Sequence, residues 1–200
     1  MADAPASAHL RLFIAVSIPE QVKAAIQAAQ GELRRVLPGS HIRWARAEQF
    51  HLTLKFLGDV AAGQLPALEQ KTREVCARFA PFEMRAEGIG FFPERGLPRV
   101  LWTGVQDREG RLPELQRALN EATVDLSSEA PEAKFTGHIT LARFKDIRRA
   151  EAEKLREAVA GLTERRFGDW TASVVEIVRS ELSPAGATHT NIAALPLSGR

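Results

Sequence analysis

Two short segments of the sequence place a histidine and a threonine two residues apart. These segments are His51-Leu-Thr-Leu54 and His138-Ile-Thr-Leu141. Both are apolar enough to be read as β-strands, in which successive side chains alternate between the two faces. The aliphatic face of each strand is therefore predicted to be core. The other face presents an imidazole and a hydroxyl about 6 to 7 Å apart along the strand.

A single histidine on a half-exposed strand is more often a structural residue than a catalyst, so either segment alone proves nothing. Two such strands meeting at one cleft would bring two imidazoles and two hydroxyls together. With pKa values of about 6.5, one imidazole can act as a general base while the other acts as a general acid. In-line displacement at phosphorus needs this pair, and hydroxyls can donate hydrogen bonds to the non-bridging oxygens. The sequence therefore predicts that His51, Thr53, His138 and Thr140 are catalytic.

The elements around the two motifs recur in the same order, which predicts an internal repeat. Leu12 precedes His51 by 39 residues, and Val100 precedes His138 by 38. The repeats span roughly residues 10–98 and 99–197. They favour an α+β fold of two lobes related by a pseudo-twofold axis. Each lobe is expected to hold a small, mainly antiparallel sheet and two helices, with the active-site cleft between the lobes.

Hydrophobic patterning supplies the predicted elements of each repeat. Extended segments are expected at residues 10–16, 42–44, 50–57, 82–92, 99–105, 138–144, 170–180 and 191–197. Four amphipathic helices are expected between them, the first opened by a capping box over residues 17–20. Gly58 and Asp59 are predicted to end the strand that carries the first motif.

The composition predicts a folded protein without a membrane span. The chain has 200 residues, of which 44% are hydrophobic and 26% charged, and its net charge is +2. A single cysteine, Cys76, cannot form an internal disulfide, so a reducing, cytoplasmic location is expected. Residues 1–8 lack the pattern of a signal peptide and are predicted to be disordered, with residues 9–200 forming one bilobal domain.

Several segments together resemble the 2H phosphoesterase superfamily. They are the two His-x-Thr-x motifs, Leu12-Phe-Ile-Ala-Val16, Lys55-Phe-Leu-Gly-Asp59, Pro98-Arg-Val-Leu-Trp102 and Leu141-Ala-Arg143. Within that superfamily the chain, from about residue 10 to residue 197, looks like the bacterial and archaeal RNA 2',3'-cyclic phosphodiesterases, also described as 2'-5' RNA ligases. The doubled motif at this spacing carries the resemblance, whereas each surrounding segment alone is a weak signal.

The resemblance implies an activity and a role for each histidine. The enzyme would open a terminal 2',3'-cyclic phosphate to a 2'-phosphomonoester without a metal or other cofactor. His51 would donate a proton to the leaving 3'-oxygen, and His138 would accept one from water. With a 5'-hydroxyl in place of water, the reverse reaction would form a 2'-5' linkage. Relatives commonly carry a tyrosine in the last segment, where this chain, which has no tyrosine, places His189.

Two basic residues close to the motifs are candidate phosphate contacts. Arg143 resembles the family's arginine after the second motif, but strict alternation would turn it away from His138 and Thr140 unless the strand twists or ends there. Lys55 lies by the same count on the face of His51. A structural ion pair for Arg143 and a solvated strand end for Lys55 are the alternatives.

The segment before the first motif supplies candidate contacts to RNA. Trp44, between Arg43 and Arg46, is the best candidate for stacking on a nucleobase, and the two arginines are candidate backbone contacts. Three other aromatic residues, Phe56, Phe92 and Trp102, are expected in the core.

Two other classes of function stay open from the sequence. A module that grips a terminal phosphate without turning it over predicts the same affinity, and a metal-dependent hydrolase predicts loss of activity in a chelator. A zinc site is disfavoured because no carboxylate or cysteine lies at ligand spacing from either motif. The expected partners are RNA with a 2',3'-cyclic phosphate terminus or 2',3'-cyclic nucleotides. A monomer suffices, because internal symmetry already builds the site.

Overall fold

The computed structural model describes residues 8–37, 42–130, 134–184 and 186–199. The N-terminal segment predicted to be disordered, apart from Ala8, lies outside the described residues. The helices are α1 (Glu20–Val36), α2 (Leu65–Cys76), α3 (Arg111–Ala122) and α4 (Arg149–Ala160), with 3-10 turns η1 (Ala47–Gln49), η2 (Ala62–Gln64) and η3 (Val124–Leu126). The strands are β1 (His9–Ser17), β2 (Ile42–Trp44), β3 (His51–Ala61), β4 (Phe82–Phe92), β5 (Val100–Gln106), β6 (His138–Phe144), β7 (Arg166–Ala172), β8 (Val174–Ser183) and β9 (Gly186–Pro196).

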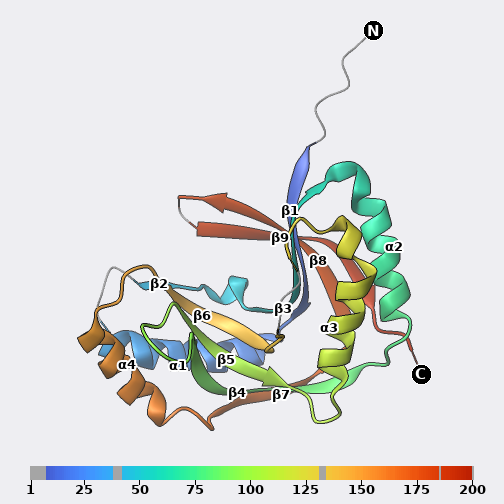
Figure 1. The fold of residues 1–200 in the computed structure, drawn as a ribbon. Helices are drawn as coiled ribbons and strands as arrows, with labels where there is room; N and C mark the ends of the chain where they lie inside the picture. The colour runs from blue at the N-terminus through green and yellow to red at the C-terminus, as the bar shows by residue number, and fades with distance from the viewer. Residues whose placement is uncertain (1–7, 38–41, 131–133, 185, 200) are drawn as a thin grey trace.

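The strands form two antiparallel sheets, each covered by two helices (Figure 1). The first sheet has the order β3-β1-β8-β9, and α2 and α3 pack on it. The second has the order β2-β6-β5-β4-β7, and α1 and α4 lie on that side. Apart from the short edge strand β2, the two orders correspond strand for strand, with β3 matching β6 and β1 matching β5. The predicted α+β fold with two lobes is confirmed.

Each lobe takes strands from both halves of the sequence. β4 precedes the predicted repeat boundary at residue 98 but pairs with β5 and β7 in the second sheet. β8 and β9 come from the end of the chain, and β8 pairs with β1 in the first sheet. A cut between residues 98 and 99 would therefore divide both sheets, so the boundary between sequence repeats is not a boundary between lobes.

The aliphatic faces of the two motif strands lie in the core, as predicted. Leu52 and Leu54 of β3 are buried, and so are Ile139 and Leu141 of β6. Both pairs belong to one hydrophobic cluster that includes residues of both sheets. The core therefore fixes which faces of β3 and β6 remain for the polar side chains.

Three predicted boundaries are wrong. Ser17 does not cap α1: it pairs with His51 in the β1–β3 ladder, and the cap position falls on Pro19 without a side-chain hydrogen bond. β3 does not end at Gly58, which adopts φ +70° within the strand. The extended segment at residues 170–180 is two strands, since β7 pairs with β4 in one sheet and β8 with β1 in the other.

Candidate active site

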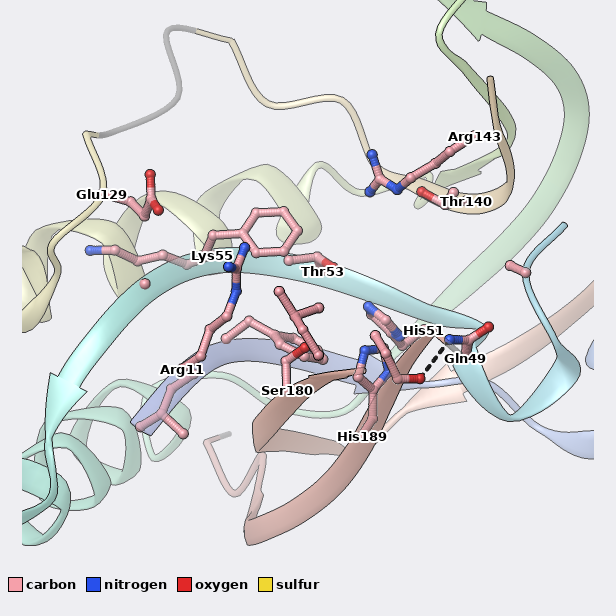
Figure 2. Close-up of a pocket in the computed structure, with 18 of the residues that line it drawn as sticks. Arg11, Gln49, His51, Thr53, Lys55, Glu129, Thr140, Arg143, Ser180 and His189 are labelled. Atoms are coloured by element: carbon pink, nitrogen blue, oxygen red, sulfur yellow. Dashed lines mark hydrogen bonds between the residues drawn. The ribbon is translucent and has the colours of Figure 1, made fainter. Parts of the chain in front are cut away.

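The two motif strands face each other across a cleft of about 1140 Å³ between the sheets. His51 and Thr53 line it from β3, and His138 and Thr140 line it from β6. Figure 2 shows His51 and Thr53 along β3, with Thr140 and Arg143 on the opposite side. The structure thus brings together the four residues predicted to be catalytic, although they come from segments 87 residues apart.

The backbone holds both imidazoles in the same way. Nδ1 of His138 lies 2.7 Å from the carbonyl oxygen of Thr136, two residues earlier. The backbone of Gln49, also two residues earlier, hydrogen-bonds the ring of His51. A neutral imidazole whose Nδ1–H donates to a carbonyl carries its basic lone pair on Nε2, so this bond selects the nitrogen of His138 that can accept a proton.

An aromatic ring packs against each histidine. Phe13 of β1 stacks on His51 with ring centroids 4.7 Å apart, and Phe92 of β4 meets His138 edge-on at 5.1 Å. Trp102 lies 6.5 Å from His138 and is half-buried, like Phe92. The prediction that Phe92 and Trp102 are core residues is therefore wrong: they support the site. Such packing limits rotation of the imidazoles.

The surroundings of His51 lower its pKa to about 4. Burial is the main cause, the neighbouring His189 is the next, and His138 and Arg143 add to the effect. The hydrogen bond that the ring donates to the backbone of Gln49 acts in the opposite direction. The ring is consequently neutral at neutral pH in the empty cleft. A bound phosphate would raise this pKa, because an anion favours the protonated ring.

A β-bulge turns Arg143 into the cleft. Leu101 pairs with Ala142, but the next residue, Trp102, pairs with Thr140, so Leu141 is an extra residue in β6. The bulge reverses the alternation, and Arg143 is exposed on the cleft side. The strict alternation that would turn Arg143 away from His138 is therefore wrong. The irregularity in the strand that the sequence analysis allowed for is this bulge, which the sequence alone does not reveal.

A bulge at the matching place in β3 moves Lys55 away from the face of His51. Leu54 is the extra residue there, and Lys55 is only 6% exposed. Its ammonium donates to the carbonyl of Asn120 on α3 at 3.1 Å. The bulge changes the alternation expected for Lys55, but this residue still lines the cleft, so its contact with phosphate stays a prediction.

Phe56 is the residue that takes the cleft position after this bulge. It is 45% exposed and lines the cleft, although the sequence predicted it in the core. Phe56 occupies the place in β3 that Arg143 occupies in β6. The two lobes therefore match in histidine and threonine but differ at the next position, which is aromatic in one and cationic in the other. Alignment of the two motifs pairs Phe56 with Arg143. This alignment is the signal from which the position of Phe56 in the cleft could have been predicted.

Arginines gather along the second sheet's side of the cleft. Arg43 of β2 lies directly opposite Arg143 of β6, and Arg46 lines the same cleft. Like charges at opposed positions of an antiparallel pair destabilise it. Among the described residues, no ion pair is found for these three side chains. This arrangement favours an anion, and the predicted contacts of the three arginines with RNA stay predictions.

Trp44 lines the cleft but has little free ring surface. It packs against the hydrophobic core, and the guanidinium of Arg34 lies 5.3 Å over its ring. Phe56 is more exposed than Trp44 and is a second candidate for stacking on a nucleobase, while the predicted role of Trp44 stays a prediction.

His189 lies in the cleft, next to His51. The two rings are 5.0 Å apart, and Phe13 contacts both. The sequence placed His189 at the position of a tyrosine in relatives, but it gave no sign of contact with the histidine of the first motif. Within the described ranges, no group of three or more His, Cys, Asp or Glu side chains is arranged to hold a metal ion.

A family model, described as LigT like Phosphoesterase, matches residues 16–102 and 105–188, including both motifs. The chain belongs to this family. The chain is 33% identical to the RNA 2',3'-cyclic phosphodiesterase of Methanothermobacter thermautotrophicus, over 92% of the chain and 96% of the relative. It is 35% identical to the Thermus thermophilus protein of the same name, over 95% and 91%. The resemblance seen in the sequence is confirmed.

Solved structures share the fold of this chain. A crystal structure of a Thermus thermophilus protein matches with a TM-score of 0.78 at 31% identity, over 95% of this chain and 99% of that one. Escherichia coli LigT in complex with 3'-AMP matches with a TM-score of 0.74 at 21% identity, over 96% and 99%. No helix in the described part of the chain is long and apolar enough to cross a bilayer.

Proposed function

We propose that the protein is an RNA 2',3'-cyclic phosphodiesterase that opens a terminal cyclic phosphate to a 2'-phosphate without a metal. The observation that carries this proposal is the pair of imidazoles and the pair of threonines that line one cleft from opposing strands. Family membership and the names of the relatives support it. The substrates are RNA ends of this kind and 2',3'-cyclic nucleotides.

In the proposed reaction, each motif acts on one side of phosphorus. A water oxygen attacks phosphorus and gives a proton to His138 while the bond to the 3'-oxygen breaks. His51 gives a proton to that oxygen, so the two histidines exchange protonation states and are reset through solvent. Thr53 and Thr140 donate to the non-bridging oxygens, and Arg143 offsets the charge that develops on them.

The low pKa of His51 is compatible with its role as the acid only if binding of the substrate raises this pKa, so that the ring takes up a proton from solvent. In the empty cleft the ring is neutral. The anionic diester beside it favours the imidazolium, so the donor becomes protonated as substrate binds. This coupling restricts the protonated form of His51 to the loaded site.

The residues that differ between the two motif strands, Phe56 and Arg143, orient the nucleotide. Arg143 is the charged contact for phosphate, and Arg43 and Arg46 extend that positive surface towards the RNA backbone. On the opposite strand, the exposed ring of Phe56 offers a face for the nucleobase. We therefore place the base on the β3 side of the cleft.

The reverse reaction, which joins RNA ends by a 2'-5' bond, has one observation in its favour. The cleft continues on both sides of the catalytic residues, to Arg11 and Glu129 at one end and Gln49 at the other (Figure 2). A second RNA end could therefore present its 5'-hydroxyl where water attacks. Hydrolysis dominates in water, because water is far more concentrated than any RNA end.

Substitution of each histidine tests this function. His51→Ala and His138→Ala should each lower turnover of a 2',3'-cyclic nucleotide by about 10²- to 10⁴-fold while binding of the 2'-phosphate product is retained. His9→Ala, at the exposed start of β1, is the control and should leave turnover unchanged. Unchanged turnover in both active-site variants rejects the proposal. Binding without turnover in the wild type identifies an RNA-end-binding module instead.

We propose further that the protein acts as a monomer in the cytoplasm. Both halves of the cleft come from one chain, so a partner is not needed to complete it. Cys76 is buried, and burial raises its pKa to about 11, which keeps the thiol protonated and unreactive. Light scattering after size exclusion should give the mass of one 22.0 kDa chain.

A further inference from the structure

The end of the β8–β9 hairpin forms a wall of the cleft. β1 pairs with β8 only at residues 176–179, so the pairing of residues 180–183 with 186–189 extends past the sheet. Figure 1 shows this hairpin projecting beyond the rest of the first sheet. Gln49 donates to the carbonyl of Ala187 at 2.8 Å, which fixes the hairpin to the turn before His51.

His189 stands on this hairpin and completes a cluster of three rings. Its ring meets that of His51 at 5.0 Å and 74°, and that of Phe13 at 5.1 Å and 73°. Phe13 in turn stacks on His51 at 4.7 Å. Figure 2 shows His189 beside His51, with Ser180 on the neighbouring strand. His51 is therefore held between a phenyl ring and a second imidazole.

Nδ1 of His189 is buried and finds no hydrogen-bond partner among the described residues. An imidazolium would carry an N–H at this atom, and a buried donor without an acceptor is costly. Burial lowers the pKa of His189, and Arg46 lowers it further. The ring is consequently disposed to be neutral, and a charge on it lowers the pKa of the neighbouring His51.

The charged groups that act on the two rings are all basic. His51 faces His138 and Arg143 from β6 and His189 from β9, and His189 faces Arg46 from the segment before η1. β1 contributes Phe13 and Ser17 at this position, neither of which titrates at neutral pH. On β8, the residue opposite His189 is Ser180.

The nearest charged side chains of β8 do not compensate this positive charge. Arg179 and Glu181 flank Ser180 and pair with each other at 3.0 Å. No carboxylate among the described residues therefore stabilises a proton on either imidazole.

We propose that His189 is a positioning residue whose ring disfavours a second proton beside it, so that His51 and His189 are not protonated together until an anion occupies the cleft. Because the rings touch and lack a carboxylate between them, a proton on His189 opposes a proton on His51. A bound phosphate compensates the positive charge and allows His51 to take up the proton that it donates. The proposal rests on the proposed function only for the fate of this proton, which His51 donates to the leaving 3'-oxygen.

Two substitutions of opposite charge test this role. His189→Gln removes the titrating group but keeps polar atoms, whereas His189→Lys makes the neighbouring charge permanent. The titration of His51 is followed by NMR in protein labelled at histidine Cε1, without substrate. In His189→Gln its midpoint should rise by about one pH unit relative to wild type. In His189→Lys it should stay at the wild-type midpoint or fall below it.

His9→Gln is the matched control, because it removes an exposed histidine at the start of β1 and should leave the His51 midpoint unchanged. A merely structural role for His189 does not predict that Gln raises the His51 midpoint while Lys fails to raise it. If His189→Lys does not fold, the comparison of His189→Gln with the wild type still tests the proposal. An unchanged or lowered midpoint in folded His189→Gln overturns the proposal.

The experiment also separates this proposal from the proposed function. Inorganic phosphate should raise the His51 midpoint in the wild type, which requires no turnover. If the midpoints behave as predicted but the wild type does not hydrolyse 2',3'-cyclic nucleotides, the function is wrong and the role of His189 stands. If hydrolysis occurs but His189→Gln leaves the midpoint in place, only the role of His189 is wrong.

Discussion

At the scale of single residues, the two imidazoles have equivalent positions and different neighbours. Each is hydrogen-bonded by backbone two residues earlier and packed by an aromatic ring. The ring of His51 also contacts a second imidazole, that of His189. The symmetry thus supplies the acid–base pair, and the unequal surroundings are what can divide the two roles.

The roles can be assigned from the residual activity of single variants. In His138→Ala, His51 is the remaining catalyst; as a donor it must be protonated, so residual kcat/KM should fall about tenfold per pH unit above its pKa. In His51→Ala, residual kcat/KM should instead rise with pH as His138 loses its proton. The measurement is kcat/KM against pH for both variants. Reversed slopes would exchange the donor and the acceptor.

The sequence was sufficient to predict the histidines and threonines but not the residues beside them. His-x-Thr follows simple alternation, and its aliphatic partners show which face is buried. The bulges after Thr53 and Thr140 change the alternation, so Lys55 and Phe56 exchange their expected places. A bulge depends on pairing with a neighbouring strand and leaves no local pattern.

At the scale of elements, the irregularities of β3 are structural requirements. Gly58 adopts φ +70°, and a Cβ there would lie 2.2 Å from Oγ of Ser128. That hydroxyl accepts the backbone N–H of Asp59 at 2.9 Å. Gly58→Ala should lower the free energy of unfolding by about 1 to 3 kcal/mol, measured by chemical denaturation.

Gly63 in η2 provides the control for this change. A Cβ at Gly63 meets nothing within 4 Å, and its φ is not positive. Gly63→Ala should therefore change stability by no more than about 0.5 kcal/mol. Equal stability of the two variants would show that β3 does not need the left-handed residue.

The pairing of β2 with β6 makes a second prediction. Arg43→Gln removes a positive charge directly opposite Arg143, so the empty protein should gain about 0.2 to 1 kcal/mol of stability. The same change should reduce the rise in Tm that phosphate produces, because part of the anion site is lost. Arg149→Gln, on α4 with a side chain 91% exposed, is the control. Lower stability of empty Arg43→Gln would contradict this account of the pair.

At the scale of the whole molecule, the two lobes share one core. Residues of both sheets belong to one buried hydrophobic cluster, and each sheet contains strands from both sequence repeats. We therefore propose that residues 9–200 unfold as one domain. Circular dichroism and tryptophan fluorescence should give coincident, single transitions. Two separated transitions would show that the lobes are independent.

The sequence predicted most elements and the symmetry of the lobes, but not how the strands are shared between them. Hydrophobic period and turn residues located β4, β6 and the four helices because these signals are local. The pairing of β8 with β1 joins the end of the chain to its beginning, and no local pattern encodes it. The short break between β7 and β8, at Ser173, therefore passed unnoticed although the chain changes sheets there.

The central claim is that two imidazoles act from opposite sides on one phosphorus atom without a metal. It is tested most directly by incubating the protein with an oligoribonucleotide ending in a 2',3'-cyclic phosphate, in excess EDTA, and following the product by ³¹P NMR. The account predicts complete conversion to a 2'-phosphomonoester. A 3'-phosphomonoester, or a cyclic phosphate that persists until a divalent metal is added, would contradict it.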